Sequence, residues 1–221
     1  MEKPSPRTVV ASGTVSTDIH GGIEFRHPDA GTDYYEGEPW VAAMDLWPLY
    51  DETDDASFGC LFGVRNYAGY RPVAADRGLP GDLSSALCER LQPWVAEGHL
   101  AGATWVSWAE IARLDPATAP DHYVGRVTWS SPARPSILHR QLVPAVWPAE
   151  LVALVGPRPN ELQDADDHAE WMSGELLCRY ESLTAGSILG PRSHWPHVFA
   201  VMKALADRFG EDAVRLVVAF G

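Results

Sequence analysis

The chain has 221 residues, 46% of them hydrophobic, and a formal net charge of −13 from 17 Lys and Arg against 30 Asp and Glu. This length and apolar content suit a globular protein with a real core, and no apolar run approaches the roughly 18 residues that a membrane span needs. The negative charge argues against broad, sequence-independent nucleic-acid binding, which depends on the neutralisation of phosphates.

The N-terminus and the cysteines indicate the compartment. Residues 1–16 contain Pro, Ser and Thr but no sustained apolar run, so we expect a flexible leader rather than a secretory signal, followed by a single domain over 17–221. The three cysteines lie far apart and form no C-x-x-C pair, which argues against a disulfide framework and a thiolate metal site. We therefore expect a cytoplasmic protein, and its cofactor, if it uses one, stays unknown from the sequence.

The first half of the chain predicts two strands followed by two helices. The strands alternate apolar and polar residues and are joined by a long loop, so we expect them to pair as an antiparallel hairpin. Helical spacing and capping residues predict the two helices. The expected elements are strands over 18–25 and 40–47, a helix over 55–66, and a helix from Asp82 or Ser84 to about Trp94.

The second half is interrupted by prolines and is clearest at its end. Ser107 and Glu110 match a capping box that opens a helix over 108–114. The remaining expected elements are a strand over 123–129, a short helix over 149–155, helical spacing at Met172, Leu176, Tyr180 and Leu183, a helix over 195–209, and a strand over 214–220. Because the last strand is apolar on nearly both faces, we expect it deep in a sheet.

These elements predict the α+β class. We expect a small, mainly antiparallel sheet with helices packed on one of its faces. The N-terminal and C-terminal strands are expected to lie side by side near the middle of the sheet.

Several short phrases resemble an uncharacterised family of actinobacterial and phage proteins. They are TDIHG at 17–21, FGVRN at 62–66, RGLP at 77–80, WVSWAE at 105–110 and VRLV at 214–217. The resemblance covers most of the chain from residue 17 onward and implies a shared outline that starts on an Asp-Ile-His strand and ends on an apolar strand. It implies no activity, because none is established for that family.

The first strand carries the strongest candidate for acid–base chemistry. Side chains of a strand alternate between its faces, so Asp18, His20 and Glu24 point away from the apolar side. Two carboxylates and an imidazole suit proton transfer, with His20 as general base or acid, Asp18 orienting it and Glu24 as a second carboxylate. A metal ion is not favoured, and the simpler interpretation is a solvated strand face or a buried histidine. The adjacent Gly21 and Gly22 indicate close approach of a backbone or ligand.

A basic, aromatic loop is the second candidate. Guanidinium groups bind phosphate or carboxylate bidentately, and tyrosine rings stack on planar groups. The alternative is that the arginines pair with nearby aspartates and tie the loop down. The candidate ligand-binding residues are Arg65, Asn66, Tyr67, Tyr70, Arg71 and Arg77.

Two functions of different classes follow, beside the further alternative of a self-associating structural protein. The first is a small enzyme that acts on an anionic, nucleotide-like or acidic small molecule, which the loop arginines hold while His20 transfers a proton. The second is a non-enzymatic acidic binding protein whose negative surface engages a protein partner or mimics nucleic-acid charge. Patches rich in tryptophan, of which the chain has nine, would form its interface. The sequence does not decide whether the protein is an enzyme.

Overall fold

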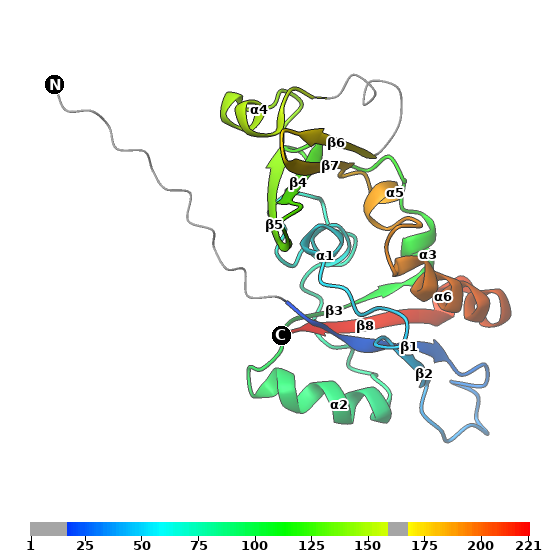
Figure 1. The fold of residues 1–221 in the computed structure, drawn as a ribbon. Coiled ribbons are helices and arrows are strands. Elements are labelled where there is room, and N and C mark those ends of the chain that lie inside the picture. The colour runs from blue at the N-terminus through cyan, green and yellow to red at the C-terminus, as the bar shows by residue number, and fades with distance from the viewer. Residues whose placement is uncertain (1–16, 159–167) are drawn as a thin grey trace.

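The computed structural model describes residues 17–158 and 168–221, which form two four-stranded antiparallel sheets with helices around them (Figure 1). The α+β class is therefore confirmed, whereas the predicted leader over 1–16 lies outside the described residues. The elements in chain order are β1 (Ile19–Arg26), β2 (Trp40–Asp45), α1 (Asp55–Phe62), α2 (Ser85–Ala96), β3 (Ala101–Ser107), α3 (Trp108–Ala112), β4 (Gly125–Ser131), β5 (Arg134–Val143), α4 (Ala149–Val155), β6 (His168–Ser173), β7 (Leu176–Ser182), α5 (Ala185–Ile188), α6 (Trp195–Phe209), the 3-10 helix η2 (Glu211–Ala213) and β8 (Val214–Phe220).

The first sheet has the strand order β2-β1-β8-β3, so the first and last strands lie side by side at its centre, as predicted (Figure 1). Their antiparallel register places Gly22 opposite Val217. Every residue of β8 is buried, which agrees with the apolar sequence of this strand. The hairpin predicted between β1 and β2 is also present.

Helices cover both faces of this sheet, which corrects the prediction that they pack on one face. Leu216 and Val218 of β8 belong to the core that contains α1 and α6. The alternate residue Val217 packs instead with Leu87 and Leu91 of α2. Figure 1 shows α2 on one side of the sheet and α1 and α6 on the other. A strand with apolar side chains on both faces is stable when helices pack against both faces, since each buried leucine stabilises the fold by about 1.5–3 kcal/mol.

The second sheet has the strand order β5-β4-β7-β6, and over β6 and β7 the prediction from the sequence was wrong. The helical spacing predicted from Met172 to Leu183 belongs to the hairpin of β6 and β7. The exposure of β6 alternates with period two, and Gly174, with φ of 59°, begins the tight turn. A left-handed glycine favours such a two-residue turn, and the apolar residues fit both periods. The sequence reading also missed β5, which tolerates Pro135 because it is an edge strand.

Local capping explains where the first helix begins and ends. Asp54 accepts a hydrogen bond from the Ser57 backbone N–H at 3.2 Å. Gly63 adopts a left-handed conformation with φ of 74°, so α1 ends at Phe62 and not at residue 66 as expected. A residue with a Cβ adopts this conformation at a cost, which is why glycine is common at this position.

Charged and polar contacts join the two sheets. Arg126 of β4 lies 2.8 Å from the carboxylate of Asp54 and also pairs with Glu181 of β7. The buried Tyr70 donates its hydroxyl hydrogen bond to the carbonyl of Leu183, beyond the end of β7. Because Asp54 caps α1, these contacts fix the second sheet to the helix that lies on the first.

Candidate functional site

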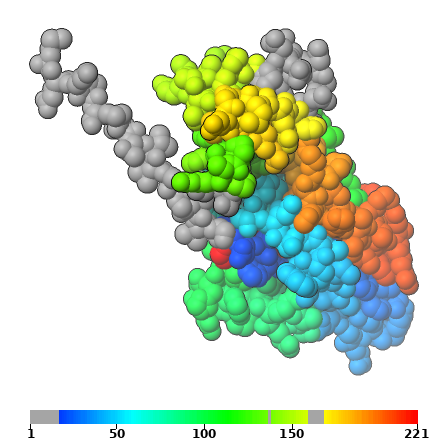
Figure 2. Space-filling model, in the orientation of Figure 1, coloured from blue at the N-terminus to red at the C-terminus, as the bar shows by residue number. Residues whose placement is uncertain are grey.

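A cavity of about 480 Å³ lies at one end of α2, where it meets the beginning of β1 and the segment that follows β2. We call it the acid cavity. Figure 2 shows the beginning of β1, in dark blue, between α2 and the light-blue segment after β2. The lining residues are Asp18, Ile19, His20, Gly21, Asp45, Trp47, Tyr50, Asp51, Glu52, Arg90, Leu91, Trp94 and Leu100.

The charge of this cavity is strongly negative. Four carboxylates, those of Asp18, Asp45, Asp51 and Glu52, face a single guanidinium group, that of Arg90. Arg90 is already engaged, because it pairs with Asp45 and donates a hydrogen bond to the Gly21 carbonyl at 3.3 Å. Three carboxylates therefore face the cavity without an arginine or lysine among its lining residues to balance them.

His194 contacts two of these carboxylates, those of Asp51 and Glu52. Nδ1 of His194 lies 2.8 Å from the Asp51 carboxylate, and its backbone N–H donates to Glu52 at 3.2 Å. The backbone N–H belongs to the start of α6, so the acidic segment after β2 is fixed to that helix. The two acidic side chains are thereby held close to the mouth of the acid cavity.

Two tryptophans form apolar walls beside these charges. Trp47 is 78% exposed and Trp94 is 53% exposed. Exposed aromatic side chains that are grouped around a cavity are typical of recognition sites. Tyr50, which is buried, completes this side of the cavity.

The structure separates the three predicted acid–base residues. Asp18 and His20 line the acid cavity, and the ring centroids of His20 and Trp94 are 6.2 Å apart. Glu24 lies on the same strand but is fully buried, where it accepts hydrogen bonds from Arg215 Nε at 2.8 Å and from the Ser84 backbone N–H at 2.9 Å. Glu24 is thus bound internally and does not line the cavity.

The predicted pair of His20 and Asp18 shares the cavity without a direct bond. In residues 17–158 and 168–221, no hydrogen bond or ion pair joins the two side chains, and the imidazole has no hydrogen-bond partner. The described residues therefore leave both ring nitrogens open to a ligand. Gly21 allows the backbone of β1 to lie close to that of β8 beside the cavity, since a Cβ there would overlap the carbonyl oxygen of Val217. The close approach that the two glycines indicated is, at Gly21, made by the backbone of β8.

Two of the predicted ligand-binding residues shape their own loop. Asn66 Oδ1 accepts the backbone N–H groups of Gly69 and Tyr70 at 3.1 and 2.8 Å, and its Nδ2 donates to the Tyr70 carbonyl at 2.8 Å. Tyr70 is buried with its hydroxyl on the Leu183 carbonyl. These side chains hold the loop in place rather than face a cavity.

The exposed residues of the same loop do not reach the acid cavity. Arg71 has 90% of its side chain exposed and lies 4.0 Å from Asp121. Tyr67 is also exposed, and Arg65 has a left-handed backbone with φ of 47°. None of the three is among the lining residues of that cavity. The structure therefore does not bring the predicted arginines together with His20.

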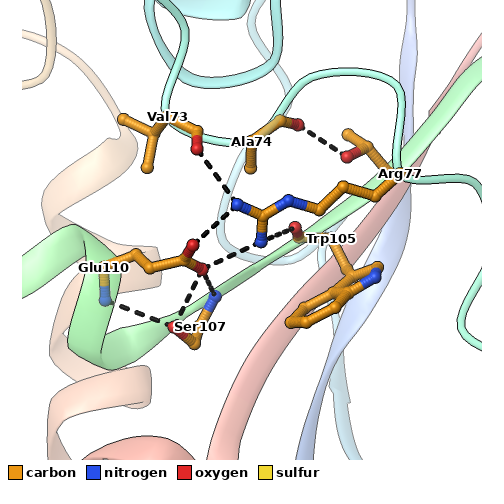
Figure 3. Close-up of polar contacts among 7 residues, drawn as sticks. Val73, Ala74, Arg77, Trp105, Ser107 and Glu110 are labelled. Carbon is orange, nitrogen blue, oxygen red and sulfur yellow. Dashed lines mark hydrogen bonds and ion pairs between the residues drawn. The ribbon is translucent and has the colours of Figure 1, made fainter.

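Arg77 is bound internally, as Figure 3 shows. Its guanidinium donates to both carboxylate oxygens of Glu110 at 2.6 and 3.0 Å, and to the carbonyls of Val73 and Trp105 at 3.1 and 3.2 Å. These hydrogen bonds, with those from Ser107, lower the pKa of Glu110 to about 2 against the effect of its partial burial. The predicted capping box of Ser107 and Glu110 is confirmed, and its carboxylate also anchors Arg77.

A second cavity, of about 410 Å³, lies at the other end of α2. We call it the arginine cavity. Sequence reasoning missed it, since its side chains come from strands and loops that are distant in the chain. Its lining residues are Arg26, Trp40, Arg77, Leu79, Pro80, Gly81, Asp82, Trp105, Ser107, Asp212 and Arg215.

Aromatic rings and guanidinium groups alternate along this second cavity. The Arg215 guanidinium lies 3.8 Å from the ring centroid of Trp40 and 5.9 Å from that of Trp105, and Arg77 lies 4.9 Å from the same Trp105 ring. Arg215 also donates to the Asp82 carboxylate at 2.8 Å. Partial burial raises the pKa of Asp82, but the hydrogen bonds from Arg215 and Trp40 bring it below its ordinary value.

A sequence signal for this network does exist. Arg215 lies within the apolar run of the last strand, and a charged residue in a buried strand needs a partner of opposite charge. Glu24, in the neighbouring strand β1, is that partner. Their pairing could have been inferred from the expectation that the two strands are adjacent.

Among the described residues, no group of three or more His, Cys, Asp or Glu side chains is placed to hold a metal ion. Within the same residues, no helix combines the length and apolar character that crossing a membrane would require.

Comparisons of the chain with models of protein families, with curated proteins and with solved structures gave no match. The geometry of the two cavities is therefore the basis for the functional argument.

Proposed function

We propose that the protein is a non-enzymatic acidic binding protein whose acid cavity receives a protonated basic side chain of a protein partner. One observation carries the proposal: carboxylates outnumber cations by four to one in a cavity whose rim holds two exposed tryptophans. The net charge of −13 would attract the same class of partner over a longer range.

Electrostatics favours a cation over an anion in this cavity. At about 4 Å and an effective dielectric constant of about 20, one pair of opposite charges gains about 4 kcal/mol before desolvation. Asp18, Asp51 and Glu52 have no arginine or lysine partner among the residues that line the cavity. An anion would meet three like charges there, and a lysine or arginine side chain would meet three opposite ones.

The tryptophans favour the same ligand. A cation over the face of an indole ring gains about 0.5–2 kcal/mol, depending on its exposure to water. Trp47 and Trp94 present large rings at the cavity while remaining accessible. Tryptophan and arginine are also the residues that dominate binding energy in protein interfaces, where a basic side chain packs between aromatic rings.

The enzyme hypothesis has less support from the geometry. His20 lines the cavity with an exposed imidazole, which a general base or acid needs in order to reach a substrate. However, Glu24 is bound to Arg215, and Arg77 is bound to Glu110. The proposed anion-binding arginines and the proposed base thus do not surround a common cavity.

Isothermal titration calorimetry with blocked tetra-arginine and tetra-glutamate peptides tests the proposal. We expect saturable binding of tetra-arginine alone, because only this peptide complements the carboxylates. Asp18→Asn and Trp94→Ala should each weaken binding about tenfold, as expected when a contact worth about 1.4 kcal/mol is lost.

Two matched variants control for charge and for aromatic surface outside the cavity. Glu150→Gln removes an exposed carboxylate from α4, and Tyr67→Ala removes an exposed ring from the loop after α1. Both should bind tetra-arginine as the unmodified protein does. If Glu150→Gln weakened binding as much as Asp18→Asn, the attraction would be a property of the net charge and the cavity would have no special role.

A further inference from the structure

The arginine cavity has the composition of a ligand site, because its lining holds more guanidinium groups than carboxylates. Three guanidinium groups, two carboxylates and two indole rings line it. We propose that this cavity binds a carboxylate group of a small organic acid, with Arg26 as the principal contact and Arg215 as a second donor. This inference does not depend on the proposed function of the acid cavity.

Arg26 supplies the free charge. It is the last residue of β1, it is exposed, and it lines the cavity. Within the described parts of the chain, no carboxylate lies in ion-pair distance of its guanidinium, whereas Arg77 and Arg215 both have such partners. An arginine without an internal partner, beside two that are paired, is available to an anion from solution.

Arg215 supplies donors at the floor. A guanidinium group carries five N–H donors. Those of Arg215 meet three acceptors among the described residues: a carboxylate oxygen of Glu24, a carboxylate oxygen of Asp82 and the Asp82 carbonyl, at 2.8, 2.8 and 3.2 Å. Only 5% of the side chain is exposed, so the remaining N–H groups gain little from water. A ligand oxygen in the cavity would satisfy them.

The indole rings of Trp40 and Trp105 favour a planar ligand in the arginine cavity. The Arg215 guanidinium lies over the Trp40 ring and farther from the Trp105 ring, which the Arg77 guanidinium also approaches. Planar groups stack favourably on such rings, and a carboxylate matches the fork of a guanidinium group. The volume of about 410 Å³ is sufficient for a small organic acid.

The carboxylates of the cavity select a singly charged anion. Asp82 and Asp212 also line it, so each added negative charge on the ligand meets two like charges. A phosphate near neutral pH carries close to two charges, whereas a carboxylate carries one. Arg77 and Arg215 are already paired, so Arg26 balances one charge of the ligand, and the second charge of phosphate would meet only Asp82 and Asp212. We therefore expect acetate to bind more tightly than inorganic phosphate.

The experiment uses the full chain with ¹⁵N-labelled tryptophan and follows the indole N–H signals by NMR. Acetate, inorganic phosphate and chloride are the probes, each at the same pH and total ionic strength. We expect acetate to shift the Trp40 and Trp105 signals saturably, and to leave those of Trp47 and Trp94 unchanged. Phosphate should act more weakly, and chloride should have no saturable effect.

Arg26→Gln is the decisive variant, since it removes the free charge and leaves the Arg215 network intact. We expect about tenfold weaker acetate binding, which corresponds to the loss of one hydrogen bond to a charged group. Arg192→Gln, which removes an exposed arginine that lies outside the lining of the cavity, is the matched control and should bind acetate normally.

Three results would overturn the inference. The first is an acetate response that is linear or equal to that of chloride. The second is an Arg26→Gln protein that binds acetate as tightly as the unmodified one, with an otherwise unchanged spectrum. The third is phosphate binding that is tighter than acetate binding. Because Trp40 and Trp105 report on this cavity and Trp47 and Trp94 on the other, a failure here is distinct from a failure of the peptide titration.

Discussion

The two cavities at the ends of α2 differ in how their charges are balanced. In the arginine cavity, Arg77 is bound to Glu110, and Arg215 is bound to Glu24 and Asp82. In the acid cavity, one arginine faces four carboxylates.

The comparison distinguishes charged groups that form internal ion pairs from charged groups that are open to a ligand. Breaking a buried ion pair by removing one partner is costly, because it leaves an uncompensated buried charge. Carboxylates at the mouth of a cavity, without a cation beside them, lose little when they are replaced. We therefore expect substitutions of the paired charges in the arginine cavity to affect stability first, and substitutions of the carboxylates in the acid cavity to affect binding first.

The largest effect is expected for Arg215→Met. The substitution leaves Glu24 charged and buried, so the free energy of unfolding should fall by about 3–5 kcal/mol. Urea unfolding followed by circular dichroism measures it. The double variant Glu24→Gln with Arg215→Met should recover part of the loss. A single variant as stable as the unmodified protein would show that this network is not structural.

Gly21→Ala is expected to come second. The new Cβ would overlap the carbonyl oxygen of Val217 in the neighbouring strand, so β1 and β8 must move apart. Overpacking of this kind typically costs about 1–3 kcal/mol. Because Gly21 also lines the acid cavity, tetra-arginine binding should weaken as well. Gly81→Ala, where a Cβ would meet open space, is the control for a loop glycine.

A smaller effect, dependent on pH, is expected for Glu110→Gln. The folded-state pKa of Glu110 is about 2, below the ordinary value of 4.5, and hydrogen bonds from Arg77 are the main cause. A lowered carboxyl pKa stabilises the folded state above the unfolded-state pKa, and this contribution disappears as the pH falls from 4.5 towards 2.

Glu110→Gln should therefore lower stability at pH 7 by roughly 1–2 kcal/mol, because partial exposure to water reduces the full electrostatic gain. The difference between variant and unmodified protein should vanish near pH 2 in urea unfolding measured across this range. A difference that stayed constant with pH would assign the loss to helix capping alone.

The smallest change in stability is expected for Asp18→Asn. The Asp18 side chain is exposed and forms no ion pair among the described residues, so the free energy of unfolding should change by less than about 0.5 kcal/mol. The same variant should bind tetra-arginine about tenfold more weakly in calorimetry. A loss of stability comparable to that of Arg215→Met would remove the contrast between the two cavities.

Much of the fold could be predicted wherever the signal is local. The helix over Trp195–Phe209 and the strand over Val214–Phe220 have long apolar patterns and clear ends. The capping box of Ser107 and Glu110 spans four residues and was also predictable. The hairpin of β6 and β7 was mistaken for a helix, because apolar residues spaced by four fit both periods.

The candidate sites were only partly predictable. Asp18 and His20 were recognised as neighbours on one strand face, since strand alternation follows from the chain alone. The packing of the elements decides the rest. It brings Glu24 to Arg215, 191 residues away, and it keeps the arginines of the loop apart from His20. Periodicity and capping act within a few residues and are encoded locally. A cavity is formed by side chains from separate elements, and only their packing in three dimensions decides which charges meet a partner and which remain open to a ligand.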